Sequence, residues 1–150
     1  MDANVLIWAW RTVNILVVED QTVTRELMIS VANAAFPGAT VRAAADLASA
    51  LSSAKSMAGL DMVLLDLGLP DSQGLDGLRC FRADFPQAKI VIVSSQDTPE
   101  LIADALDLGA SGFIPKNLGI PGMIAALKLV AQGGVYHPPG FARSPSDKGA

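Results

Sequence analysis

The sequence predicts an α/β protein built on a doubly wound, five-stranded parallel sheet with five helices. Short aliphatic runs alternate five times with longer stretches whose apolar residues recur at helical spacing. Hydrophobic residues make up 51% of the chain but aromatic residues only 5%, which is typical of helices packed on an aliphatic sheet. Each helical stretch can connect two parallel strands, and 150 residues suffice for one domain with its own core.

The strands are expected where apolar runs are too short to form helices. The run that ends at Asp66 is apolar throughout, as in strands buried on both faces of a parallel sheet. The second run is less apolar and predicts a weak strand. We expect strands at residues 13–18, 40–44, 61–66, 89–93 and 111–115. If their order is 2-1-3-4-5, the strand that ends at Asp66 lies at the centre of the sheet.

The helices are predicted from apolar stripes and from residues that begin or end helices. Asp46 and Thr98 can cap helix N-termini, and Pro99 suits a first helical position. Glycine follows several of the stretches and ends them. The predicted helices cover residues 22–36, 47–58, 75–84, 99–108 and 120–132.

Charge and cysteine content restrict the partners and the compartment. The net charge of −4 argues against direct binding to the nucleic-acid backbone or to an anionic membrane surface. The single cysteine, Cys80, excludes an internal disulfide framework. We therefore expect a cytoplasmic protein in which Cys80 is a buried structural thiol.

Composition divides the chain into three parts. Residues 1–12 are expected to be an N-terminal extension, because their apolar run lacks a basic leader and is too short to cross a bilayer. Residues 13–134 contain the five strand–helix units and are expected to form the domain. Residues 135–150 are rich in proline and are expected to be a linker or a tail.

Polar side chains follow four of the five predicted strands. They are, in chain order, Glu19, Asp20, Asp66, Ser94 and Lys116. Because the carboxyl ends of parallel strands lie at one edge of the sheet, these side chains should converge there. Lys116 should lie two strands from Asp66, roughly 10 Å away at ~4.8 Å per strand, a gap that a lysine can cover.

These residue types suit phosphoryl transfer onto a carboxylate. Clustered carboxylates repel one another unless a cation lies among them, and their oxygens suit a hard ion such as Mg²⁺. Asp66 can act as a nucleophile toward a phosphoryl donor. The metal and Lys116 would neutralise charge on the transferred group, and Ser94 would supply a hydrogen bond.

In order and spacing, this set resembles the motif of the receiver domain of bacterial two-component response regulators, over residues 13–134 and so over nearly the whole chain. The resemblance implies a flavodoxin-like fold and a phosphorylation-driven signalling switch rather than a metabolic enzyme. It implies that Asp66 is the phosphoacceptor. It also implies Mg²⁺ ligands at Glu19, Asp20, Asp66 and the Gly68 backbone carbonyl, and switch or phosphoryl-binding roles for Ser94, Lys116 and Phe113.

Two further segments, residues 108–113 and 134–139, resemble receivers that are joined to a C-terminal helix-turn-helix of the LuxR or NarL type. The implied partners are a sensor histidine kinase, a second copy of the chain, and DNA only through an output domain that we expect to be absent here. In one respect the chain departs from the family: Asn117 follows Lys116 where many members have proline. A cis peptide bond after Lys116 is therefore not expected.

Taken singly, each residue has an ordinary interpretation. An aspartate after a strand is usually a turn or cap residue, a strand aromatic such as Phe113 is usually core, and Asp71 reads as a loop acid. The alternative function is an interaction module that uses the fold without phosphorylation. An aspartate-nucleophile phosphohydrolase would need an acid two residues after Asp66, where Gly68 stands.

Overall fold

Five parallel strands form one sheet in the order β2-β1-β3-β4-β5, which confirms the predicted order and fold class. The computed structural model describes residues 12–138, 140 and 141. The strands are β1 (Asn14–Val18), β2 (Thr40–Ala44), β3 (Met62–Asp66), β4 (Lys89–Ser94) and β5 (Gly112–Pro115).

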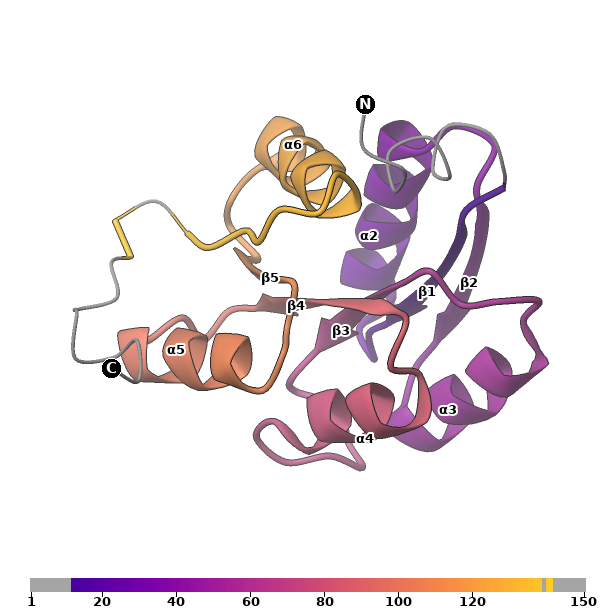
Figure 1. Cartoon of the computed structure of the whole chain (residues 1–150), viewed down its shortest axis with the longest axis horizontal. Helices are drawn as coiled ribbons and strands as arrows, with labels where there is room; N and C mark the ends of the chain where they lie inside the picture. The colour runs from indigo at the N-terminus through magenta and orange to yellow at the C-terminus, as the bar shows by residue number, and fades with distance from the viewer. Residues whose placement is uncertain (1–11, 139, 142–150) are drawn as a thin grey trace.

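Helices cover both faces of the sheet. α2 and α6 lie on one face, and α3, α4 and α5 lie on the other (Figure 1). The predicted helices are confirmed, and the largest boundary difference is in α3, which ends at Ser56 rather than at residue 58. The helices are α2 (Thr22–Ala35), α3 (Leu47–Ser56), α4 (Asp76–Asp84), α5 (Pro99–Asp107) and α6 (Ile120–Ala131).

The core consists of two apolar layers, one on each side of the sheet. Successive strand residues point to opposite faces, so Leu64 joins the layer that contains Met28 of α2, while Leu65 joins the layer that contains Phe81 of α4. Every residue of β3 is buried. Burying each such leucine stabilises the fold by about 2 kcal/mol. Asp66 therefore stands at the end of a strand that is packed from both sides.

The strand β2 and the residue Cys80 both lie at the margin of the core. β2 is an edge strand and is largely exposed, which accounts for its weak apolar pattern. Cys80 is half-buried, so the prediction of a buried thiol was wrong. It lies on α4 between the exposed Arg79 and the fully buried Phe81, and this places it at the margin of the apolar face.

The outer edge of β5 is covered by the segment that follows α6. Tyr136 forms a parallel bridge with Gly112. The Phe113 amide donates to the Tyr136 carbonyl at 2.9 Å, and the Tyr136 amide donates to the Ser111 carbonyl at 3.1 Å. A Cβ at position 112 would lie 3.3 Å from Cγ2 of Val130 and 3.4 Å from the Tyr136 Cβ, so glycine leaves room for both neighbours. The domain boundary expected at residue 134 stays a prediction, but Tyr136 packs on the sheet.

Residues 1–11, which make up most of the expected N-terminal extension, lie outside the described residues. Among the helices that the structure describes, none combines the length and the apolar character needed to cross a bilayer.

Candidate phosphoryl-transfer site

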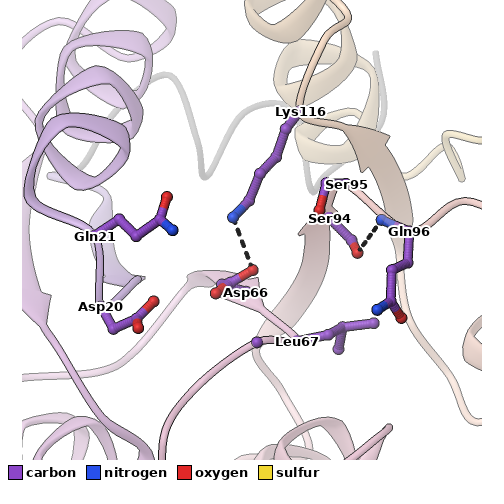
Figure 2. A pocket seen from close by; sticks show the side chains of 9 residues that line it. Asp20, Gln21, Asp66, Leu67, Ser94, Ser95, Gln96 and Lys116 are labelled. Atoms are coloured by element: carbon purple, nitrogen blue, oxygen red, sulfur yellow. Dashed lines mark hydrogen bonds and ion pairs between the residues drawn. The ribbon is translucent and has the colours of Figure 1, made fainter.

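The predicted polar residues converge at the carboxyl edge of the sheet. Asp66 ends the central strand β3, between β1 and β4. A pocket of about 180 Å³ opens over it, and Figure 2 shows how the side chains surround it. Its lining comes from the ends of four strands: Asp20, Gln21, Asp66, Leu67, Gly68, Ser94, Ser95, Gln96 and Lys116.

Lys116 reaches across two strands to the carboxylates, as its position in the sequence predicts. Its Nζ lies 2.7 Å from Oε1 of Glu19 and 3.0 Å from Oδ1 of Asp66. Its backbone amide donates to the Ser94 carbonyl at 2.9 Å, which fixes the chain at the exit of β5. Burial alone lowers the pKa of the Lys116 ammonium, but the paired carboxylates outweigh burial and the pKa is raised.

Glu19 is the most enclosed of the acids, with no exposed surface. Burial raises the pKa of its carboxyl, against the opposing influence of Lys116 and of the Gln21 amide, which donates to Oε2 at 3.2 Å. Oε1 has the ion pair with Lys116 but no aligned hydrogen bond. A buried oxygen without an aligned donor can still accept a metal ion or a better-placed donor.

The three carboxylates fit a hard divalent cation. Glu19, Asp20 and Asp66 each offer one oxygen, and these oxygens lie within 4.8 Å of one another. Asp20 is exposed at the mouth of the pocket, whereas Asp66 is only 5% exposed. One ammonium cannot balance three carboxylates, and oxygen ligands of this kind suit Mg²⁺. The donor set therefore fits the metal that the sequence suggests.

Gly68 lies directly beside the Asp66 carboxylate. A Cβ built on Gly68 would be 3.4 Å from Oδ2 of Asp66 and 3.9 Å from its Oδ1. A longer side chain here would compete for the space in front of the carboxylate. Glycine leaves that space open, and an acid that could serve a phosphohydrolase is absent from this position.

Ser94 lies at the end of β4 and Phe113 lies within β5. Ser94 is buried, and its Oγ accepts a hydrogen bond from the Gln96 amide at 3.0 Å (Figure 2). Phe113 is fully buried in the layer against α3, α4 and α5. None of the described peptide bonds is cis, in agreement with the expectation for Lys116 and Asn117.

One residue that shapes this edge was not found from the sequence. Asp71, which reads as an ordinary loop acid, accepts from the Leu47 amide at 2.7 Å and from the Ala48 amide at 3.0 Å. These hydrogen bonds lower the pKa of its carboxyl. The partners lie more than 20 positions away in the chain, so no local pattern reveals the contact.

Comparisons with known proteins agree with this geometry. A sequence model of the response regulator receiver domain matches residues 15–128. The glycerol metabolism activator of Pseudomonas putida is 37% identical over 135 residues, which cover 90% of this chain and 61% of that protein. The chain thus spans about three fifths of the length of that relative.

Two solved structures are similar as well. One is a LuxR family DNA-binding response regulator from Silicibacter pomeroyi, at 29% identity and a TM-score of 0.75 over 86% of this chain and 99% of that chain. The other is the signal receiver domain of the putative response regulator NarL from Mycobacterium tuberculosis, at 25% identity and a TM-score of 0.70 over 82% and 98%. Since the matched region includes all five polar residues of the sheet edge, the chain belongs to the response regulator receiver domain family, with relatives of the LuxR/NarL type.

Proposed function

We propose that this chain is a phosphoacceptor switch that takes a phosphoryl group from a sensor histidine kinase onto Asp66 in the presence of Mg²⁺. The observation that carries the proposal is the position of Asp66. Its carboxylate faces an open pocket, 3.0 Å from Lys116 and within 4.8 Å of the ligand atoms of Glu19 and Asp20. This arrangement provides a nucleophile together with charges of both signs around the group to be transferred.

In the proposed step, an oxygen of Asp66 attacks the phosphorus of a phosphohistidine. The P–O bond to Asp66 forms, the P–N bond breaks, and the imidazole leaves with a proton from solvent. Glu19, Asp20, Asp66 and the Gly68 carbonyl would hold Mg²⁺, and the ion would neutralise charge on the phosphoryl oxygens. Lys116 would exchange its bond to Asp66 for one to the phosphoryl group.

The response to phosphorylation would begin at Ser94. Its hydroxyl would leave the Gln96 amide and donate to a phosphoryl oxygen, drawing the loop after β4 inward. Phe113 would report the change through its rotamer, because it lies on β5 only three positions before Lys116. Such a local change of charge can bias a surface made by α5, β5 and α6.

The wider setting follows from the relatives. Because the solved LuxR family relative is described as DNA-binding, we infer a transcriptional output, with DNA contacted by an output domain and not by the receiver domain. The proposal places the protein in the cytoplasm, with a possible second copy as partner. It assists its own phosphorylation and slow dephosphorylation and has no metabolic substrate.

The test is to incubate the chain with Mg²⁺ and acetyl phosphate and to weigh the intact protein. We expect the wild type to gain the mass of one phosphoryl group, and Asp66→Ala to gain none. An equal gain in the variant, or no gain in the wild type, overturns the proposal.

The alternative is an interaction module that keeps the fold without phosphorylation. A calorimetric Mg²⁺ titration separates the two functions. The switch requires wild type to bind Mg²⁺ more tightly than Asp20→Ala. A titration without heat in both proteins favours the module.

A further inference from the structure

We propose that Asp71 is a positioning residue for the metal site: its carboxylate anchors the loop between β3 and α4 to the N-terminus of α3 and thereby holds the Gly68 carbonyl beside Asp66. This inference rests on the proposed function, because it concerns the same Mg²⁺ site. It assigns a role to a residue that lies outside the pocket lining.

The Asp71 carboxylate accepts two hydrogen bonds from a distant part of the chain. Oδ1 of Asp71 accepts from the Leu47 amide at 2.7 Å, and Oδ2 accepts from the Ala48 amide at 3.0 Å. Both amides belong to the first turn of α3, where N–H groups have no partner within the helix. A carboxylate there is stabilised by charge-assisted hydrogen bonds and by the positive end of the helix dipole. The contact therefore ties the loop to a helix rather than to solvent.

The loop from Asp66, at the end of β3, to Asp71 is short. Gly68 lies two residues after Asp66, which ends β3, and three residues before Asp71. In this loop Leu69, which is 4% exposed, lies in the core, and the partly buried Leu67 packs against the same apolar layer. A Cβ built on Gly68 would lie 3.4 Å from Oδ2 of Asp66, so the loop passes close to the carboxylate at this residue. Releasing Asp71 therefore lets the loop backbone shift where the metal would bind.

The chain supplies a matched control on the same helix. Asp46 is the N-cap of α3 and accepts from the Ser49 amide at 2.7 Å. Like Asp71, it satisfies the first turn of α3, but it belongs to the connection after β2 and not to the loop that carries Gly68. Removing either carboxylate weakens the cap of α3, whereas only Asp71→Ala releases the loop.

The experiment is a calorimetric Mg²⁺ titration, without phosphodonor, of the full chain and three variants. We expect Asp71→Ala to bind Mg²⁺ about tenfold more weakly than wild type, as found when groups that orient metal ligands are removed. Asp71→Asn, which retains one acceptor oxygen, should recover part of the affinity. Asp46→Ala should bind like wild type even though its melting temperature falls as well.

Two results overturn the inference: wild-type affinity in Asp71→Ala, or an equal loss in Asp46→Ala, which would assign the effect to helix capping. If Asp71→Ala does not fold, the comparison of Asp71→Asn with Asp46→Ala decides in the same way. A wild type that binds no Mg²⁺ overturns the proposed function together with this inference. Normal binding by both wild type and Asp71→Ala overturns the inference alone.

Discussion

Lys116 compensates the charge of two buried carboxylates at the edge of the sheet. Its pairing with Glu19 and Asp66 was predictable, because all three follow strands whose carboxyl ends must meet. The contact of Ser94 with the Gln96 amide was not predictable, since a hydroxyl has several possible partners and the loop conformation selects one. Residue identity thus revealed the members of the site but not all of their hydrogen bonds.

Lys116→Met should destabilise the fold in a pH-dependent way. Without the ammonium, Glu19 is left as a buried unpaired carboxylate. We expect the free energy of unfolding to fall by about 2 kcal/mol at pH 7.5. This is less than the cost of breaking a fully buried ion pair, because Lys116 is 23% exposed. The pKa of Glu19 is already raised above 4.5 and rises further in the variant. The penalty is therefore absent below pH 4.5 and grows as pH rises through the folded-state pKa.

Urea unfolding of Lys116→Met and wild type at pH 5 and pH 7.5 measures this difference. Lys128→Met, at an exposed position on α6, serves as the control and should change little at either pH. A loss that is equal at both pH values would contradict the assignment to Glu19.

At the scale of elements, the alternation of strands and helices was predictable because each element carries its own signal. Apolar runs indicated β1, β3 and β4, and Asp46 and Thr98 were expected as the caps that the structure contains. Two contacts between elements that the sequence did not reveal, Asp71 on α3 and Tyr136 on β5, both join segments distant in the chain. Their local composition is that of ordinary loops.

The cap of α3 by Asp71 should appear in the acid stability of the protein. Its pKa is lowered from 3.8 by the Leu47 and Ala48 amides, so its contribution is present above pH 3.8 and is lost as pH falls through the folded-state pKa. Between pH 5 and pH 3, Asp71→Asn should therefore lose less stability than wild type, which thermal melts can follow. Asp97 is an exposed acid after β4, and Asp97→Asn serves as the control. It should lose as much stability as wild type between the two pH values.

Tyr136→Ala should destabilise the edge of the sheet. The half-buried side chain packs on the layer under α2 and α6, while its backbone pairs with β5. We expect a loss of about 1–2 kcal/mol in the free energy of unfolding, in proportion to the apolar surface uncovered. Tyr136→Phe keeps the ring and should be close to wild type. Equal stability of Tyr136→Ala and wild type would mean that the Tyr136 side chain contributes nothing to the fold.

At the scale of the whole molecule, the strand order matters most for function. The order β2-β1-β3-β4-β5 places Asp66 at the centre of the carboxyl edge, with acids on one side and Ser94 and Lys116 on the other. A different order with the same strands would separate Lys116 from the acids. The fold class was predictable because five strand–helix units with right-handed crossovers form a parallel sheet with helices on both faces. The strand order itself was implied by the resemblance to receiver domains.

Binding of Mg²⁺ to the folded protein should stabilise the whole molecule. At a metal concentration tenfold above the dissociation constant, the free energy of unfolding should rise by about 1.4 kcal/mol. Calorimetric melts with and without Mg²⁺ test this expectation. Asp20→Ala should lose most of the rise, whereas Asp104→Ala, an exposed acid on α5, should keep it. A rise that is retained in Asp20→Ala would locate the metal elsewhere.

The most direct measurement is chemical location of the phosphoryl group. After treatment with Mg²⁺ and acetyl phosphate, borohydride reduces an acyl phosphate to the alcohol, and peptide mass spectrometry identifies the modified residue. We expect one reduced residue, Asp66, and no reduction when Mg²⁺ is chelated. Labelling at another carboxylate, or none in a folded protein that binds Mg²⁺, would contradict the assignment of Asp66 as phosphoacceptor.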